Sequence, residues 1–286
     1  MALLRGSWFE SFGIFGSQDG GPNPSRIQGR SYGVSGGIDA RWPRSWPGSE
    51  QIRVGMGLGY TRHSPQGDHG MRGEANSFQT ALYGSWQHGG AHLGWAGRYA
   101  YSELETTRRI TFGALDRRAR GDTSGHEAGG MVEILFRLGD PKRLALRPLA
   151  RFEYNYMTRG EIVESGAGDL SLTAEGANFS MLTADLGLSL STLYTLGGEF
   201  GLEAEIRGGW RREFGDLERP IRARFHAVPG AVAFTTRGVA ADANDFHVGT
   251  GYVMSVSKVP LVGLNYDVFI GDTVTRHVLS AQLYLR

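Results

Sequence analysis

The chain has 286 residues, a formal net charge of +1 and no cysteine. A charge this close to neutral argues against a general nucleic-acid binder, whose contact surface would be strongly basic. The absence of cysteine excludes a disulfide framework and thiolate-bound zinc. No run approaches 18 consecutive apolar residues, which excludes a transmembrane helix. A membrane β-barrel stays possible, because its strands need only about 9–11 residues each.

Apolar residues alternate with polar or very small ones at a period of two through most of the chain. The clearest segment is 51–63, where Ile, Val, Met, Leu and Tyr alternate with Arg, Gly and Thr. Segments 144–157, 180–192 and 199–213 repeat the pattern with full charges on the polar face. These strands exceed the roughly 5–6 residues common in soluble sheets. Long strands with one apolar and one polar face are typical of barrels that are apolar outside and polar inside.

The alternation predicts twelve antiparallel strands and therefore an all-β, transmembrane antiparallel β-barrel of the outer-membrane type. The strands are expected at residues 7–15, 31–42, 51–63, 77–88, 91–103, 126–137, 144–157, 180–192, 199–213, 244–257, 260–270 and 275–286. The connections between them alternate in length. Short ones are expected at 43–50, 89–90, 138–143, 193–198 and 257–259. Long ones are expected at 16–30, 64–76, 104–125, 158–179 and 215–243, and the final turn, 271–274, is short.

Short turns face the periplasm and long loops face outward in such barrels. We therefore expect both chain termini on the periplasmic side of the outer membrane. The long connections 104–125 and 215–243 also contain apolar runs, which could extend neighbouring strands as hairpins above the membrane.

The aromatic residues separate between the two ends of the expected barrel, as interfacial girdles do. Tryptophans fall at the periplasmic ends of strands and of one turn, at Trp8, Trp42, Trp46, Trp86 and Trp95. Tyrosines fall at the extracellular ends, at Tyr32, Tyr60, Tyr99, Tyr101, Tyr154 and Tyr156. This separation supports the predicted orientation independently of the loop lengths.

The polar face of the predicted strands carries a set of charged residues that would share one lumen. They are Asp39, Arg53, Arg98, Arg151, Glu153, Asp185, Glu203, Glu205, Arg207 and Arg211. One interpretation is mutual pairing that neutralises a narrow, wet interior. The other is a polar surface that contacts a helix or an extended chain inside the pore. The two interpretations are compatible.

Motifs that could indicate catalysis or metal binding have structural explanations here. Ser35 satisfies the G-x-S-x-G pattern of hydrolases, but that chemistry needs a strand-to-helix turn, and Ser35 falls in the middle of a strand. His63 and His69 lie near Asp68 in an expected loop, where solvation is the simpler interpretation than a metal site. We predict no catalytic residue, metal or cofactor, and no enzyme activity.

Several segments resemble, in order, the autotransporter β-domain, the translocator unit of type V secretion. They are SWFESFGIFG at 7–16, SYGVSGGID at 31–39, LYGSW at 82–86 with the Gly89-Gly90 turn, LRPLARFEY at 146–154, WRREF at 210–214, VGTGY at 248–252, LNYD at 264–267, and His277 before the C-terminus. The resemblance implies one translocator domain over residues 1–286. It implies a barrel inserted by the barrel-assembly machinery that anchors an N-terminal passenger and helps to export it.

The resemblance also implies a pore helix just before the first strand. Only six residues precede Ser7, so the passenger and most or all of that helix are expected to lie outside this chain. The expected partners are the passenger, the pore helix, the assembly machinery and outer-membrane lipid, with no nucleic acid, and the barrel is expected to be a monomer.

The C-terminus departs from the family pattern by one residue. Family members end in an outward Phe preceded by alternate apolar residues, which here are Leu279, Ala281, Leu283 and Leu285, so the aromatic would follow Arg286. We expect this face to be the assembly signal, either truncated by one residue or natively degenerate. The alternative functions are a stand-alone outer-membrane porin or adhesion barrel and, less favoured, an outer-membrane hydrolase. A soluble β-sandwich is the alternative fold.

Overall fold

The computed structural model describes residues 4–19, 26–42, 51–140, 142–226, 230, 232–237, 240–257 and 259–285. The predicted turn 43–50, Trp46 and the side chain of Trp42 lie outside the described residues, as does Arg286.

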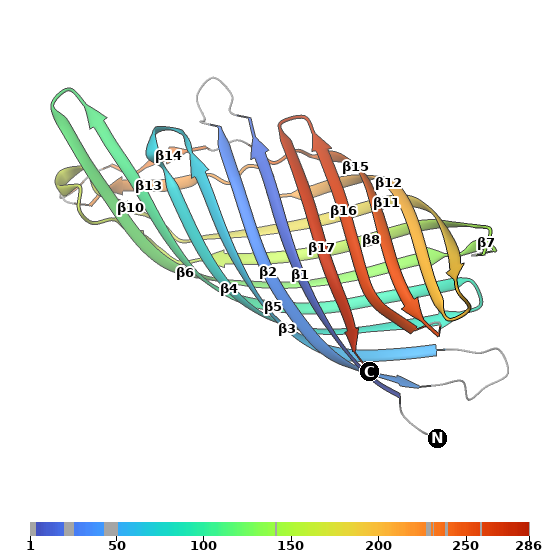
Figure 1. The fold of residues 1–286 in the computed structure, drawn as a ribbon. Coiled ribbons are helices and arrows are strands. Elements are labelled where there is room, and N and C mark those ends of the chain that lie inside the picture. The colour runs from blue at the N-terminus through green and yellow to red at the C-terminus, as the bar shows by residue number, and fades with distance from the viewer. Residues whose placement is uncertain are drawn as a thin grey trace.

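The twelve predicted strands are all present and form a closed antiparallel wall (Figure 1). They are β1 (Leu4–Gln18), β2 (Ile27–Trp42), β3 (Gln51–Gly67), β4 (Arg72–His88), β5 (Ala91–Phe112), β6 (Leu115–Phe136), β8 (Leu144–Arg159), β11 (Ala177–Leu196), β12 (Phe200–Gly215), β15 (Asn244–Val256), β16 (Val259–Gly271) and β17 (Val274–Leu285). Each strand pairs with its neighbours in the chain order of these twelve, and β17 pairs with β1 to close the barrel. Short β7 (Leu138–Asp140) pairs with β8.

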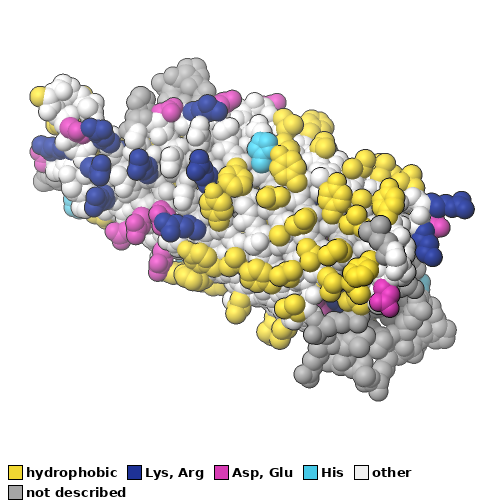
Figure 2. Space-filling view, viewed as in Figure 1, with side chains coloured by type: hydrophobic (Ala, Val, Ile, Leu, Met, Phe, Trp, Pro, Cys, Tyr) yellow, Lys and Arg dark blue, Asp and Glu magenta, His cyan; other side chains and the backbone are white. Residues whose placement is uncertain are grey.

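The barrel is apolar outside and polar inside. Ile38, Met56 and Leu58 on the outer face are 61%, 56% and 70% exposed, whereas Asp185 and Asp245 are buried. Side chains of successive strand residues point to opposite faces, so the period-two alternation of the sequence separates the two surfaces. On the face drawn in Figure 2, hydrophobic side chains gather over the part of the barrel nearer the chain ends and form a hydrophobic band. Among the described helices, none is long and apolar enough to cross a membrane.

The segment predicted as the loop 104–125 is a tall hairpin, which is the alternative that its apolar runs suggested. β5 and β6 pair without interruption up to Phe112 and Leu115, and the turn between them places Gly113 at φ +57°. A positive φ favours glycine. Beyond Tyr101 the hairpin carries charged residues such as Arg109 and Asp116, so it rises past the hydrophobic band (Figures 1 and 2).

The long connections 158–179 and 215–243 also contain strands, which together form a second, small sheet. We call it the upper sheet, and its order is β14 (Phe234–Thr236), β13 (Ile221–Phe225), β10 (Leu172–Ala174) and β9 (Ile162–Val163). Short 3-10 turns lie at η1 (Asp68–Gly70) and η2 (Gly168–Leu170).

The upper sheet joins the tall hairpin where β8 no longer accompanies β6. The backbone of Arg120 exchanges two hydrogen bonds with Ser165, and Gly160 N–H donates to the carbonyl of Ser124. An uncovered strand edge exposes unpaired backbone groups. The connection that follows β8 therefore covers this edge of β6 and continues the wall above the barrel.

Candidate functional site: the barrel interior

The ten charged residues predicted to line the lumen all occupy the inner face. They alternate along their strands with residues of the exposed outer face, such as Ile52, Tyr99, Phe152 and Ile206. Residues directly opposite on paired strands share a face of the sheet. Buried Asp185, for example, stands opposite Arg151 on one neighbouring strand and opposite Arg211 on the other. The structure therefore gathers them on one surface.

Five inner residues of alternating sign stand opposite one another across five neighbouring strands. They are Glu133 of β6, Arg151 of β8, Asp185 of β11, Arg211 of β12 and Asp245 of β15. Arg151 binds Glu133 through Nε, at 2.9 Å, and through Nη2. Arg211 Nε lies 3.5 Å from Asp185. Opposite charges placed directly across a sheet stabilise the pairing.

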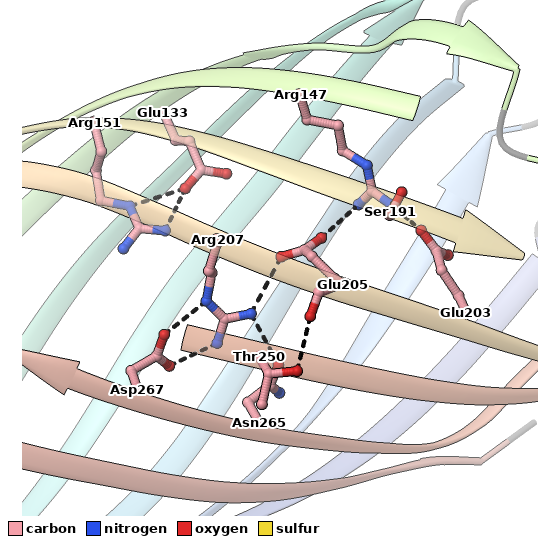
Figure 3. A network of polar contacts seen from close by, with 10 residues as sticks. All are labelled: Glu133, Arg147, Arg151, Ser191, Glu203, Glu205, Arg207, Thr250, Asn265 and Asp267. Atoms are coloured by element: carbon pink, nitrogen blue, oxygen red, sulfur yellow. Dashed lines mark hydrogen bonds and ion pairs between the residues drawn. The ribbon is translucent and has the colours of Figure 1, made fainter. Parts of the chain in front are cut away.

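A second network links β8, β12 and β16 (Figure 3). Arg147 of β8 forms ion pairs with Glu203 and Glu205 of β12, two strands away. Arg207 binds Glu205 at 3.2 Å and Asp267 of β16 at 2.6 Å. Asp267 was not among the predicted lumen residues, although it follows the same alternation.

Arg98 of β5 holds a third cluster, which reaches across β6 to β8. Its Nη2 donates to Glu127 at 2.6 Å, to Asn155 at 2.8 Å and to Glu153 at 3.2 Å. Arg53 is less closely paired, since its Nε lies 3.9 Å from Asp39. Arg151 and Glu153 do not pair with each other, because Arg151 binds Glu133 of the adjacent β6 and Glu153 accepts from Arg98 of β5, two strands away.

Glycines on the inner face allow these charges to reach past an intervening strand. A Cβ on Gly129 would overlap the side-chain oxygen of Asn155, and one on Gly249 would overlap the carboxylate of Asp267. Strand glycines commonly mark a close approach of this kind. Here they make room for polar side chains that run along the wall.

The inner face of β1–β4 is lined mainly by aromatic rings and glycine, beside the pairs that Asp39 forms with Arg41 and Arg53. The indole of Trp8 lies over Gly37 and donates a 2.5 Å hydrogen bond to the hydroxyl of Tyr83, and Phe12 lies over Gly33. The prediction that Trp8 belongs to an outward girdle is therefore wrong. Trp8 stands at the expected end of the barrel. Its side chain points inward, because it is the neighbouring residue Phe9 that faces outward on β1.

The other predicted girdle residues with described side chains lie on the outer face. Five of them are 36–49% exposed: Trp95, Tyr99, Tyr101, Tyr154 and Tyr156. Tyr60 donates to Asn76 and packs 5.2 Å from the ring of Phe78, and Trp86 stacks on His88.

The residues weighed as catalytic or metal-binding do not come together. Ser35 lies mid-strand opposite Glu10 and Gly59, and His63 hydrogen-bonds Ser31 instead. Within the described part of the chain, no group of three or more histidine, cysteine, aspartate or glutamate side chains could hold a metal ion. His247 Nδ1 lies 3.9 Å from Asp185 Oδ2, which is beyond hydrogen-bonding distance.

The inner residues that sequence reasoning missed are mainly the partners of those it found. They include Glu133, Arg147, Asp245, Asp267 and Arg276. All but Arg276, which stands between Thr275 and His277, alternate with outward apolar residues, so the same signal could have located them.

The model of the autotransporter β-domain family matches residues 7–267. The chain belongs to this family. It is an outer-membrane translocator barrel of type V secretion. The match covers all of the inner-face residues described above except Arg276.

Solved structures agree on the fold. The translocator domain of the autotransporter NalP from Neisseria meningitidis superposes with a TM-score of 0.70 at 14% identity, covering 99% of this chain and 88% of that chain. The β-domain of the Bordetella autotransporter BrkA gives a TM-score of 0.71 at 18% identity, covering 98% of each chain. An extracellular serine protease of Serratia marcescens is 26% identical over 263 residues, which are 92% of this chain and 24% of that protein. This β-domain thus spans about a quarter of the length of the curated relatives it matches.

Proposed function

We propose that this β-domain anchors an N-terminal passenger in the outer membrane and helps to export it through the barrel interior. Both described ends of the chain lie at one end of the barrel, opposite the tall hairpin and the upper sheet (Figure 1). Placing those ends toward the periplasm puts the long connections at the cell surface, as is usual for outer-membrane barrels. The passenger and the pore helix lie outside residues 1–286 in this proposal.

The observation that carries the proposal is the interior of paired charges. Arg147, Arg151 and Arg207 each bind a carboxylate of another strand, so the wall is polar without a large excess of either sign. Such a surface favours water over apolar side chains. It lets a helix or an extended chain form polar contacts without strong adhesion, which suits export. The ten predicted lumen residues are the proposed contact surface.

The final strand supports a second contact, with the barrel-assembly machinery. Leu279, Leu283 and Leu285 are 55%, 45% and 57% exposed on the outer face, and Ala281 shares their alternation. This apolar row at the closing strand is the proposed assembly signal, and the assembled barrel is proposed to be a monomer in lipid.

The decisive experiment expresses the natural gene with its upstream coding sequence and asks whether an N-terminal segment becomes accessible to protease on intact cells. Surface exposure that depends on residues 1–286 is the expected result. A signal peptide directly before Met1, with no exported segment, would instead identify a stand-alone porin or adhesion barrel.

The lumen assignment is tested separately by Arg151→Ala and Glu153→Ala in planar bilayers. Both variants should insert normally and change the single-channel conductance, because they alter the charge of the inner wall. Phe152→Leu, which changes the outward residue between them, is the matched control and should leave conductance as it is. Unchanged conductance in all three would contradict the assignment.

A further inference from the structure

The outer face of the barrel carries a groove centred on β6, in the middle of the hydrophobic band. In one row of directly opposed residues, Gly97 of β5 and Gly130 of β6 lie between Leu82 of β4 and Tyr154 of β8. Outward Ala128 continues the floor along β6. The groove is part of a broader hollow of about 1330 Å³ that also takes in residues of β2, β3 and β11.

The glycines of this floor differ from the crowded glycines of the inner face, such as Gly37. A Cβ added to Gly97 would meet no described atom within 4 Å, and one on Gly130 would meet only the carbonyl of Ala96, at 3.6 Å. A Cβ on inward Gly37 would instead come within 3 Å of Trp8. Glycine inside a strand costs roughly 0.5–1 kcal/mol relative to alanine. Crowding therefore explains Gly37 but not the outward pair, whose missing side chains leave open space on the outer face.

The walls and the ends of the groove define what would fit. Trp95 and Tyr99 of β5 face Phe152 and Tyr154 of β8 across the floor, and all four side chains are 41–53% exposed. The strand backbones below are hydrogen-bonded to one another, so the floor offers few polar partners. From Val132 to His126 the floor of β6 extends about 20 Å at roughly 3.3 Å per residue. The strip over β6 is therefore long and apolar, which suits an apolar chain.

We propose that this groove binds one acyl chain of a phosphate-bearing membrane lipid. The groove is continuous with the surface that contacts the bilayer, so lipid is the molecule it meets. At the end toward the tall hairpin, the Tyr99 hydroxyl and His126 Nδ1 share a 2.7 Å hydrogen bond, and the ring of Tyr101 packs on His126. This polar pair marks the position of the headgroup. The proposal depends only on the barrel being in a membrane, so it stands or falls separately from passenger export.

The test fills the groove and counts bound lipid. Gly97→Leu with Gly130→Leu places two side chains on the floor. Gly208→Leu is the matched control, since Gly208 of β12 is also outward, stands between exposed Leu188 and Val248, and would meet only the carbonyl of His247, at 3.5 Å. Each protein is reconstituted into vesicles of phosphatidylethanolamine and phosphatidylglycerol, extracted in mild detergent and measured by native mass spectrometry.

The natural protein and Gly208→Leu should retain one phospholipid, and the double variant should retain it at least about tenfold less. Equal retention in all three proteins, or none in any, overturns the proposal. So does a dimer that only the double variant abolishes, because a second copy would then occupy the groove. Heat-dependent gel mobility verifies folding. If the double variant does not fold, Gly97→Leu and Gly130→Leu are compared singly by the same criterion.

Discussion

Arg207 and Asp267 form a bidentate ion pair across the backbone of Gly249, although their strands are not neighbours. Arg207 Nε and Nη2 donate to the two carboxylate oxygens at 2.7 and 2.6 Å. Residue 249 stands directly between them, opposite Arg207 on β12 and Asp267 on β16. A Cβ at this position would overlap the carboxylate. The pairing of charges along the inner wall thus depends on where glycine occurs in the strand between them.

Gly249→Ala should therefore destabilise the barrel by about 1–3 kcal/mol, the usual cost of leaving a largely buried charged or polar group without its partner. The midpoint of urea unfolding in detergent, followed by gel mobility, measures the change. Gly208→Ala is the control on the neighbouring strand, because its Cβ has space on the outer face. Equal midpoints for the two variants would show that the pair across Gly249 contributes nothing to stability.

The inward position of Trp8 predicts a difference between tryptophans in lipid. Trp95 lies on the outer face and should be quenched by phospholipids brominated on their chains. Trp8 lies over Gly37 inside the barrel and should not be. Variants that each retain one of these tryptophans, with the others changed to phenylalanine, separate the two signals. Strong bromolipid quenching of Trp8 would place it in the outward girdle after all.

The sequence was sufficient to predict the twelve strands and the inner charges, because within the membrane one face must be apolar. Above the hydrophobic band that requirement ends. Residues 103–109 of the tall hairpin are mostly polar on both faces, so alternation gives no signal there, and 104–125 resembles a loop. In the upper sheet β13 (Ile221–Phe225) does alternate, but the other strands are only 2–3 residues long, too short to show a pattern. The pairing of β10 with β13 also joins two connections far apart in the chain.

Aromatic residues on both faces of β1 explain the error at Trp8. Phe9 and Phe15 face outward, whereas Trp8 and Phe12 face inward over glycines of β2. Composition alone does not decide which set meets lipid. The partners of the inner charges also required the register, since Glu133 stands opposite Arg151 only when β6 and β8 are aligned.

The upper sheet should be held to the tall hairpin by the pair of Arg108 and Glu164. Arg108 donates to the two carboxylate oxygens at 3.2 and 2.7 Å, and Leu172 N–H donates to the same carboxylate at 2.8 Å. Glu164→Ala should lower the local opening free energy of residues 162–174 by about 1–3 kcal/mol. Faster hydrogen exchange in this segment, at unchanged barrel unfolding, is the expected result.

The control for that variant is Glu161→Ala, which removes an exposed carboxylate that has no side-chain partner among the described residues. Exchange at 162–174 should then match the natural protein. If Glu164→Ala also leaves exchange unchanged, the backbone pairing of Arg120 with Ser165 is enough to hold the sheet in place.

The tip of the tall hairpin carries a pair whose pH dependence can be measured outside the membrane. Arg109 donates to both carboxylate oxygens of Asp116, at 2.9 and 2.6 Å, and these hydrogen bonds hold the pKa of Asp116 below its usual value. Because the pKa is lowered in the folded hairpin, the stabilisation is present above the unfolded pKa of aspartate and is lost as the pH falls through the lowered one. Arg109 stays charged throughout.

A carboxyl NMR titration should show a lowered pKa for Asp116. Arg109→Gln should return this pKa to its usual value, whereas Arg120→Gln, further along β6, should not. Since both side chains are more than half exposed, added salt should also bring the pKa of Asp116 back toward its usual value. If neither Arg109→Gln nor added salt changes the pKa of Asp116, then solvent, not Arg109, sets the pKa of this carboxylate.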